Sequence, residues 1–385
     1  MILTILITII VLGLLVFVHE LGHFIMAKRA HMQVDEFGFG FPPRVLGVQR
    51  VQGKWKVVWG SKSAAQGGET VYSLNSIPLG GFVKIVGENG DSLEHPNSFS
   101  HKTFFARLST LLAGVTMNVV LAWVLMSIGF ALGVPAVVES DTPLQHGAQL
   151  SAPRVTILDV EAQSPAAKAG LRGGDGILKI DEVQVDDIAA VQSYITQHKG
   201  HTFQMRVLRG KTELNVSVAS RSQPEPGEGP TGIALGMVGS LRYPWYYAPV
   251  MGAKSVYGQL GNIFVGLYSL VSGNVTFGQL GGPAKIAQLT GQASQLGVSY
   301  VLQFTAFLSL NLAVFNVLPI PALDGGRVLF LIIEKVRGRK NNQAVEAWVN
   351  SIGFIALLGL ILAVSVNDVR SFGGVGQIVS KLFGG

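Results

Sequence analysis

Long apolar runs separated by polar segments dominate the pattern of hydrophobic and polar positions along this chain. The first run covers residues 2 to 18, where two threonines, one glycine and one phenylalanine are the only residues that are not aliphatic. Runs of this length and apolarity are typical of membrane-crossing helices. Further runs lie at 104–134, 300–318 and 352–366. The pattern therefore predicts an α-helical multi-pass membrane protein with four transmembrane helices.

The first run has a second interpretation, a cleaved signal peptide. Such a peptide needs a basic start and a cleavage site of small residues. Residues 1 to 8 contain no Lys or Arg, and the run continues directly into His19 and Glu20. We therefore expect a retained transmembrane helix over 1–30.

Composition supports a membrane protein. Only 14% of the 385 residues are charged and the mean hydropathy is +0.42, whereas about 25% of residues are charged in an average soluble domain. The net charge of +6 could suggest a nucleic-acid partner. However, twelve of the 29 Lys and Arg residues lie in two segments beside apolar runs, residues 28–62 and 327–340. Such clusters beside apolar runs are typical of cytoplasmic loops that face an anionic membrane surface, and no nucleic acid is needed to explain them.

These basic loops also give an orientation. Four spans with cytoplasmic loops after the first and third place both termini and the long loop 135–299 on the extracytoplasmic side. A segment at 245–272 is ambiguous because Lys254, Gln259 and Asn262 interrupt its apolar run. We favour an interfacial amphipathic helix there over a fifth span, because a fifth span would conflict with the basic loop at 327–340.

Two parts of the chain predict β-structure. The block 153–220 contains VTILDV, GILKID and FQMRVLRG, which are short runs rich in branched residues, and the helical segment AAVQSYITQH. This block predicts one extracytoplasmic α+β domain, followed by a Pro- and Gly-rich linker. Residues 54–86 contain WKVVWG, TVYSL and FVKIVG around Gly-rich turns. They predict strands within a loop that is too apolar for a simple solvated connection.

The sequence His19-Glu20-Leu21-Gly22-His23 carries the strongest chemical signal. Residues four apart share one helix face, so both imidazoles can bind one metal ion while Glu20 reaches a water molecule as general base. A pair of solvated histidines would explain the pattern on a soluble helix. Ionisable groups beside a membrane span are costly, however, and mark a functional site by default. With no cysteine in the chain, nitrogen and oxygen must hold the metal.

Two histidines leave a catalytic zinc site one protein ligand short. Asp324 is the candidate for the third, because it ends the sequence NVLPIPALDGG at the cytoplasmic end of the third apolar run. Pro319 and Pro321 break the helix there, and backbone freed at membrane depth must line a cavity or lie inside the protein. The alternative is a plain helix-ending turn, Asp-Gly-Gly. The remaining histidines lie in polar segments and are expected at the surface.

These motifs together resemble the site-2 protease family of intramembrane zinc metalloproteases, of the regulator-of-sigma-E-protease type. HELGH matches the family pattern HExxH, and Asn316 to Gly325 matches NxxPxPxLDG. The resemblance implies one Zn²⁺ per chain bound by His19, His23 and Asp324, with Glu20 as general base and then acid. It also implies that Asn316 holds the substrate backbone or the tetrahedral oxyanion.

Three further features carry the resemblance. AGLRGGDGILKID, within 153–220, is similar to a PDZ domain, a type that takes peptide C-termini. ETVYSLNSIPLGGFVKI is similar to the membrane-associated β-hairpin of the family, which would pair with an unwound substrate strand; a peripheral sheet that only anchors the loop is the alternative. AGVTMN keeps an asparagine that would line the site, with Val115 where many members have proline. The implied substrate-binding residues are Asn316, Pro319, Pro321, Asn118, Leu74, Gly80, Gly81 and Phe82.

The resemblance implies cleavage of transmembrane segments of single-span membrane proteins, both anti-sigma-factor-like substrates and signal-peptide remnants. It places the chain in the bacterial cytoplasmic (inner) membrane, with the lipid bilayer as a partner and the active site near the cytoplasmic side. A catalytically silent PDZ-containing membrane adaptor is the main alternative, and a metal transporter is another. An adaptor has no reason to keep Glu20 beside three ligands, and a transporter needs polar residues along a whole path. The expected domains are 1–30, 31–103, 104–134, 153–220, 221–299, 300–325, 326–350, 351–367 and a tail at 368–385.

Overall fold

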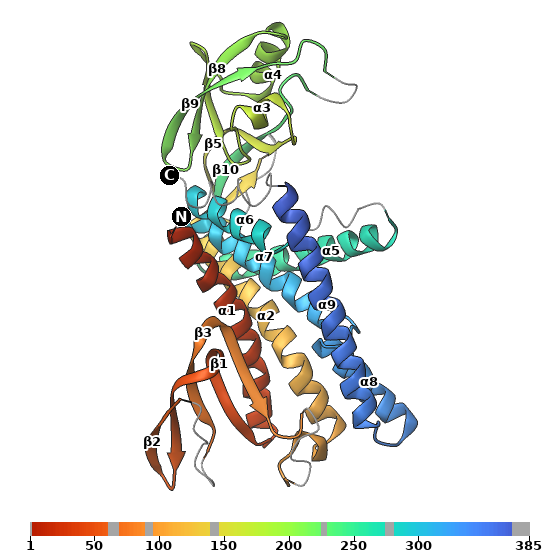
Figure 1. The fold of residues 1–385 in the computed structure, drawn as a ribbon. Helices are drawn as coiled ribbons and strands as arrows, with labels where there is room; N and C mark the ends of the chain where they lie inside the picture. Colours follow the sequence, from red (N-terminus) through yellow and green to blue (C-terminus); the bar gives the residue numbers. More distant parts are fainter. Residues whose placement is uncertain are drawn as a thin grey trace. The chain divides into compact units, whose positions relative to one another are not determined.

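The computed structural model describes residues 2–60, 69–88, 95–138, 146–224, 229–273 and 281–371. Most of the tail expected at 368–385 lies outside these residues. The chain divides into two compact units, which are described separately (Figure 1). The helical unit comprises Met1–Leu125, Lys254–Gly291 and Phe304–Gly385. The sheet unit comprises Met126–Ala253 and Gln292–Gln303.

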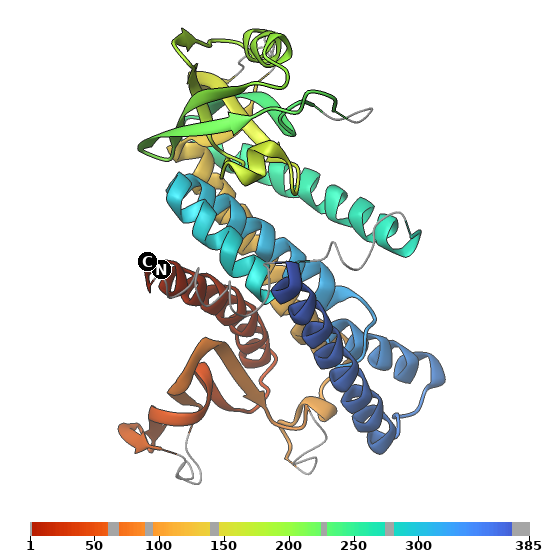
Figure 2. The same ribbon diagram turned by 45° about the horizontal axis from the view of Figure 1, so that its top comes forward.

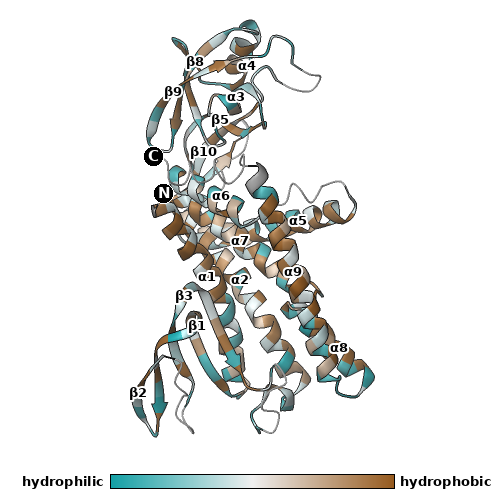
Figure 3. Cartoon of the chain, viewed as in Figure 1, coloured by the Kyte–Doolittle hydropathy of each residue, from teal (hydrophilic) through white to brown (hydrophobic). Residues whose placement is uncertain are grey.

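Four helices in the described residues are long and apolar enough to cross a membrane, as the sequence predicts. Hydrophobic residues cover most of their length (Figure 3). They are not uniformly packed: only 6% of the most apolar window of the last helix is buried inside the protein, against 44% for the second. Apolar surface of this kind suits contact with lipid chains. The four helices are α1 (Ile2–Arg29), α2 (Phe104–Leu132), α7 (Val298–Val317) and α9 (Gln343–Ser371).

The third apolar run does not continue as one helix to residue 325. The helix α7 ends at Val317, and a new helix, α8 (Asp324–Arg337), begins after a short connection. The two prolines of the motif cannot donate helical hydrogen bonds, so the chain must turn there. The connection is held from α9, because the Asn350 side chain accepts a hydrogen bond from the Ala322 N–H at 3.1 Å. This break places Asp324 at the start of a helix.

The ambiguous segment forms α5 (Ala248–Val271). It is not among the helices of the described residues that could cross a membrane by length and composition, and its interfacial location stays a prediction. The next helix is α6 (Pro283–Leu296). Its first turn is capped from α9, since the buried Asp368 carboxylate accepts hydrogen bonds from the backbone N–H of Gly282 at 3.3 Å and of Lys285 at 3.1 Å.

A three-stranded sheet follows α1, with strand order β2-β1-β3. It consists of β1 (Val34–Val51), β2 (Lys54–Trp59) and β3 (Val71–Ile85). The first half of β3 lies between the two halves of the bent β1, because Leu74 pairs with both Phe39 and Leu46. The second half, residues 81–85, pairs only with the first half of β1. Within the described residues β3 therefore ends the sheet with an open backbone edge.

This sheet packs directly on α1 (Figure 2). Gly80 has φ +91°, and a Cβ there would lie 2.5 Å from the Cβ of Val16 on α1. A Cβ on Gly81 would lie 3.0 Å from the Gly38 carbonyl oxygen and 3.1 Å from the Phe17 ring. Glycine at these two positions lets the backbone of β3 touch the helix, which side chains would prevent.

The sheet unit contains a twisted antiparallel sheet with strand order β4-β10-β5-β6-β8-β9, plus β7 on β6. Its core consists of alternating apolar residues such as Ile157, Ile177 and Met205, all fully buried. The α+β domain expected at 153–220 is larger in the structure, since strands on both sides join the same sheet. The elements are β4 (Val134–Val137), β5 (Gln149–Val160), α3 (Pro165–Lys168), β6 (Gly176–Ile180), β7 (Val183–Gln184), α4 (Ile188–Gln197), β8 (Thr202–Arg209), β9 (Thr212–Ala219) and β10 (Ile233–Arg242).

Side-chain hydrogen bonds hold the helices and turns of this domain. The buried hydroxyl of Ser164 accepts a hydrogen bond from the Ala167 N–H at 3.1 Å and caps α3. Asp181, at the turn between β6 and β7, accepts hydrogen bonds from the Tyr194 hydroxyl at 2.6 Å and the Gln204 N–H at 2.8 Å. Both bonds favour the ionised form and lower the pKa of the Asp181 carboxyl.

Candidate metal centre and active site

Two helices bring three potential metal ligands together. His19 and His23 lie on one face of α1, and Asp324 is the first residue of α8. The Nε2 atoms of the two histidines are 3.2 Å apart. Oδ2 of Asp324 lies 3.0 Å from Nε2 of His19 and 3.3 Å from Nε2 of His23. The candidate ligands that the sequence predicts thus meet at one point, across 305 residues of chain.

The spacing of these atoms suits zinc. Ligand bonds of about 2.0 to 2.1 Å in a tetrahedral arrangement place neighbouring ligand atoms about 3.3 Å apart. The three observed separations are all close to that value. Both histidines are buried, with 7% and 6% of their surface exposed. Three ligands at three corners leave the fourth corner for water or substrate, as in catalytic zinc sites.

A glycine on α2 makes room for the two imidazoles. A Cβ on Gly114 would lie 2.5 Å from Nε2 of His23 and 2.7 Å from Nε2 of His19. No side chain other than hydrogen fits there, so the backbone of α2 forms one wall of the metal centre. Gly22, within the HELGH sequence, has the same role on α1, since a Cβ there would overlap the Ala113 carbonyl group. The two helices therefore cross with their backbones in contact.

Hydrogen bonds from α2 orient the rings. Nδ1 of His23 lies 2.8 Å from the backbone carbonyl oxygen of Thr110, to which it donates when Nε2 is a metal ligand. Such a bond fixes the tautomer and the plane of the ring. The hydrogen bond to Thr110 also requires the backbone of α2 to lie close to α1.

Asn118 has the corresponding position beside His19. Its side-chain Nδ2 lies 3.1 Å from Nδ1 of His19, and its Oδ1 is buried without a partner among the described residues. A neutral imidazole that binds metal through Nε2 carries its hydrogen on Nδ1. Turning the amide by 180° gives this hydrogen an oxygen acceptor. The backbone carbonyl oxygen of Asn118 accepts a hydrogen bond from the buried Ser309 hydroxyl on α7 at 2.8 Å.

Glu20 connects the metal centre to the sheet. Its Oε2 accepts a hydrogen bond from the backbone N–H of Val83 at 3.1 Å. Val83 lies in the second half of β3, which pairs only with β1. The carboxylate of the predicted general base is therefore attached to the open edge of the sheet.

The remaining predicted site residues lie in the same unit. Asn316 is half-buried on the last turn of α7, and its side chain makes no hydrogen bond with the described residues. Pro319 and Pro321 lie in the connection to α8. Gly80, Gly81 and Phe82 belong to the open half of β3, next to Val83. Leu74 differs from these residues, because both halves of β1 pair with it. Only its half-exposed side chain is therefore free to contact a substrate.

Sequence reasoning missed several residues around this centre. Gly114 and Thr110 follow no motif that names them, although AGVTMN marks the right segment of α2. A polar cavity of about 290 Å³ also lies in the helical unit. It is lined by residues that follow β3, by α2, by α8 and by the start of α9. Two ion pairs border it, Glu88 with Arg327 and Glu334 with Arg107, the latter at 2.7 Å.

Two histidines and an aspartate at zinc-ligand spacing, a neighbouring glutamate and apolar helices around them define a metal-dependent hydrolase of the membrane. The model of peptidase family M50 matches residues 7–60 and 61–360 of this chain. The match covers most of the sequence, and the chain therefore belongs to peptidase family M50. It is a zinc metalloprotease, as the sequence resemblance implies.

Two relatives illustrate the similarity. The chain is 28% identical over 457 residues to the regulator of sigma-W protease RasP of Bacillus subtilis, with 95% of this chain and 98% of that protein covered. It is 28% identical over 454 residues to the zinc metalloprotease RasP of Geobacillus kaustophilus, with 94% and 97% covered. Similarity thus extends over nearly the full length of both proteins.

One solved structure is similar to a part of this chain. The PDZ domain of an SdrC-like protein from Listeria monocytogenes matches 23% of this chain and 92% of its own, at 22% identity and a TM-score of 0.20. A likeness at that TM-score carries no weight for fold or function.

Proposed function

We propose that this protein hydrolyses peptide bonds within the transmembrane segments of single-span membrane proteins. The observation that carries the proposal is the contact between the metal centre and a strand edge, through the hydrogen bond from Val83 to Glu20. A soluble protease could hold the same three ligands. A ligand set inside apolar helices, joined to an edge that can receive an extended chain, suits a substrate that arrives through the bilayer.

His19, His23 and Asp324 would hold the metal ion. Zinc bound there supplies Lewis-acid chemistry, polarising the scissile carbonyl group and lowering the pKa of water to about 7. Thr110 and Asn118 keep both imidazoles in the orientation that binding requires.

Glu20 is the proposed general base. It takes a proton from the attacking water as the oxygen forms its bond to the carbonyl carbon, and then gives that proton to the amide nitrogen as the C–N bond breaks. Its place next to His19 on α1 keeps the carboxylate beside the metal ligands. Asn316 is the proposed partner of the oxyanion or of the substrate backbone, and its unengaged amide supports this role.

The open half of β3 is the proposed substrate-binding edge. A peptide bond within a helix is shielded, because its carbonyl is already hydrogen-bonded, so the substrate must unwind locally. An unwound segment can add a strand to a free sheet edge. Gly80, Gly81 and Phe82 would line that strand, with Leu74, Pro319 and Pro321 contributing side-chain contacts.

Hydrolysis also needs water at membrane depth. The polar cavity of about 290 Å³ offers a source, because its wall includes Arg327, one turn after Asp324, and Glu88, just after β3. With the basic loops on the cytoplasmic side, this cavity would open toward the cytoplasm. We propose that the protein lies in the bacterial cytoplasmic (inner) membrane, with the sheet unit and both termini extracytoplasmic.

Substrates of the anti-sigma-factor type are proposed on the relative from Bacillus subtilis, whose name describes a regulator of sigma-W. Remnants of signal peptides fit the same chemistry, since they are single apolar segments. The sheet unit adds a proposed contact for peptide C-termini. There β10 pairs with β4 only over residues 238–241, which leaves residues 233–236 open on that side among the described residues.

The test uses purified wild type and Glu20→Gln in detergent, with a model single-span substrate and mass spectrometry of the products. We expect one zinc per chain in both proteins, and cleavage by the wild type alone. Treatment with a zinc chelator should abolish that cleavage, and added zinc should restore it. Wild type that holds zinc but leaves the substrate intact would contradict the proposed substrate class. Loss of both zinc and cleavage would favour a silent adaptor.

A further inference from the structure

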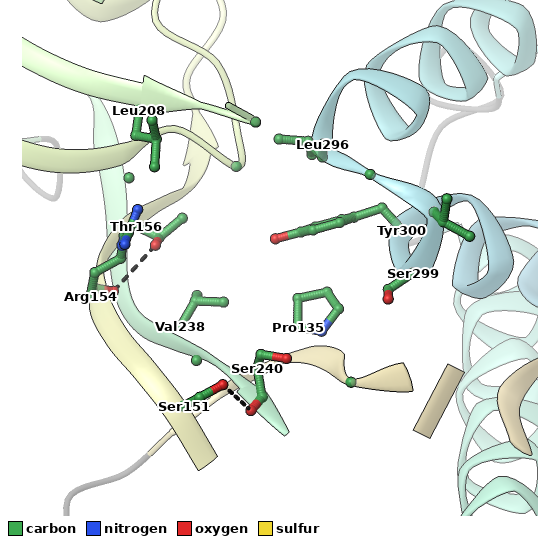
Figure 4. Close-up of a pocket in the computed structure, with 17 residues that line it drawn as sticks. Pro135, Ser151, Arg154, Thr156, Leu208, Val238, Ser240, Leu296, Ser299 and Tyr300 are labelled. Atoms are coloured by element: carbon green, nitrogen blue, oxygen red, sulfur yellow. Dashed lines mark hydrogen bonds between the residues drawn. The ribbon is translucent and has the colours of Figure 1, made fainter. Parts of the chain in front are cut away.

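A second cavity lies in the sheet unit. Its volume is about 320 Å³, and it is bounded by β5, β6, β8 and β10 on one side and by residues 296–300 on the other (Figure 4). Glycines form much of its wall. A Cβ on Gly174 would lie 2.7 Å from the Leu296 side chain, and a Cβ on Gly210 would overlap the Gln295 carbonyl oxygen. The start of α7 thus packs against the turns of the domain and closes a hollow between them.

Unpaired polar groups face this cavity from opposite walls. Arg154 lies flat across Gly176, where a Cβ would meet its Cδ at 2.7 Å, and Tyr300 reaches in from α7 (Figure 4). Among the described residues, neither the Arg154 guanidinium nor the hydroxyls of Tyr300, Ser299 and Ser240 make a hydrogen bond or an ion pair. Within the described ranges, which leave out residues 139–145 after β4, no acidic residue lines the cavity. A half-buried cation without a counter-charge favours an anionic ligand.

The neighbouring elements indicate what carries this anion. Two helices that could cross a membrane end at the cavity wall, α2 just before Gly133 and α7 at Val298. The segment after β10 adds Trp245 and Tyr246, which are 81% and 65% exposed. Exposed Trp and Tyr side chains gather at the headgroup level of membranes. The cavity thus borders the level at which lipid phosphates lie.

We infer that this cavity binds the phosphate group of a phospholipid headgroup. Arg154 can grip two phosphate oxygens through its fork of N–H groups, and the hydroxyls of Tyr300 and Ser299 can donate to the others. Bound lipid would tie the strands of the sheet unit to the helix ends that form the opposite wall.

The test is retention of lipid by the full-length protein, measured by native mass spectrometry. Dioleoyl phosphatidylglycerol is compared with dioleoylglycerol, which has the same chains and no phosphate, and with glycerol 3-phosphate, which has no chains. Wild type should retain one phosphatidylglycerol, and Arg154→Gln should weaken this binding about tenfold, as expected for a lost charge-assisted contact. Arg206→Gln, an exposed cation on β8 outside the cavity, should leave it unchanged.

Tyr300→Phe provides a second variant, since it removes one hydroxyl and keeps the ring that closes the wall. A few-fold loss of phosphatidylglycerol is expected. Equal losses for Arg154→Gln and Arg206→Gln would overturn the inference. So would retention of dioleoylglycerol as strong as that of phosphatidylglycerol, which would show a site for chains alone. Glycerol 3-phosphate binding as tightly as the lipid would show a site for free phosphates and would overturn it as well.

An independent observation, the contact between Glu20 and Val83, carries a second inference that rests on the proposed function. The Val83 N–H points out of the sheet edge to which a substrate strand would pair. One N–H cannot serve both the carboxylate and a substrate carbonyl. We propose that the substrate strand displaces Glu20 from Val83, so that pairing at the edge frees the base to meet the attacking water.

Two neutral variants of similar size separate this competition from other effects. Glu20→Gln keeps an oxygen that accepts from Val83, whereas Glu20→Leu has none. The probe is a fluorescent copy of a single-span peptide that wild type cleaves, with affinity measured by anisotropy in detergent. Glu20→Leu should bind the peptide about fivefold more tightly than Glu20→Gln, the effect of one competing hydrogen bond.

Two further outcomes distinguish failure of the Glu20 displacement from failure of the proposed protease function. Equal affinities, or tighter binding by Glu20→Gln, would overturn the displacement of Glu20 while wild-type cleavage keeps the protease function. If wild type cleaves no single-span peptide, the proposed function itself fails and takes this inference with it. Reducing the paired substrate carbonyl to a methylene group should erase the difference between the variants.

Discussion

Buried polar groups of the metal centre find partners much farther along the chain than those of the sheet unit, where the buried Asp175 accepts from Arg209, 34 residues on. In the metal centre, His19 meets Asp324 across 305 residues and Asn118 across 99. In the sheet unit, the Ser164 hydroxyl caps α3 by accepting a hydrogen bond from the N–H of Ala167, which is only three residues away. Hydrogen bonds between residues close in sequence can form before the rest of the chain has folded. Hydrogen bonds between distant residues form only after the helices have packed. The residues for chemistry thus depend on tertiary structure far more than those for architecture.

The largest effect on zinc binding is expected from changing Asp324, whose contact with His19 joins residues 305 positions apart in the sequence. Asp324→Asn removes the anionic ligand, and we expect zinc affinity to fall more than about 100-fold, beyond the range found for residues that only orient ligands. Cleavage should be lost with the metal. Zinc content is measured by mass spectrometry of the purified protein. Asp368→Asn is the matched control, since it changes another buried carboxylate, and it should keep its zinc. Full zinc occupancy in Asp324→Asn would contradict the ligand assignment.

Gly114→Ala should have the next largest effect. The added methyl group would lie 2.5 to 2.7 Å from both imidazoles and must push α1 and α2 apart. Zinc affinity should fall about 100-fold, the upper end for changes around metal ligands. Gly258→Ala in α5, where a Cβ would meet nothing within 4 Å, serves as control. A competition titration with a zinc chelator measures both. Equal affinities would show that the helices accommodate the methyl group.

Asn118→Leu should weaken zinc binding about tenfold, because His19 loses the acceptor that holds its tautomer. The same titration applies, with Asn311→Leu on α7 as control, whose side chain bonds only its own helix. Asn118→Asp keeps an oxygen acceptor and should retain more of the affinity than Asn118→Leu. The reverse order would contradict the role of this side chain as an acceptor.

The smallest effect is expected in the sheet unit. Ser164→Ala removes a buried cap and should lower the free energy of unfolding of that unit by about 1 kcal/mol. Zinc content and cleavage should not change, because the contact is local. Hydrogen exchange of the slowest amides in β5 and β8 measures the stability. Ser193→Ala, at an exposed position of α4, should have no such effect. Loss of zinc from Ser164→Ala would contradict the expectation that this contact affects the stability of the sheet unit alone.

The sequence predicts well what depends on short spacing. Four apolar helices, the strands β2, β3, β5, β6 and β8, and the helix α4 follow from periodicity and length. The three proposed metal ligands could be named from the sequence because HExxH and the LDG motif each have a local pattern, and the structure brings the three side chains together. Family membership, shown by the comparison with peptidase family M50, agrees with the resemblance those motifs carry.

Other features could not be predicted, for physical reasons. The strand β1 contains Pro42, Pro43 and several glycines, which usually interrupt strands, and only its pairing on both sides of β3 keeps it extended. The strand β10 lies beyond a Pro- and Gly-rich segment that marks a linker in sequence. Gly114 lies within AGVTMN, but its role depends on the imidazoles that pack against it, as the role of the Val83 N–H depends on Glu20.

The separation of His19 from Asp324 also has a consequence for biosynthesis. Ribosomes add about 5 to 20 residues per second, so roughly 15 to 60 seconds pass between the two residues. During that interval the histidines are already made and the aspartate does not exist. The newborn chain therefore carries its HExxH sequence into the membrane in an inert form. With Asp324 as the proposed third ligand, the metal centre stays incomplete until the segment after the third apolar run has been translated.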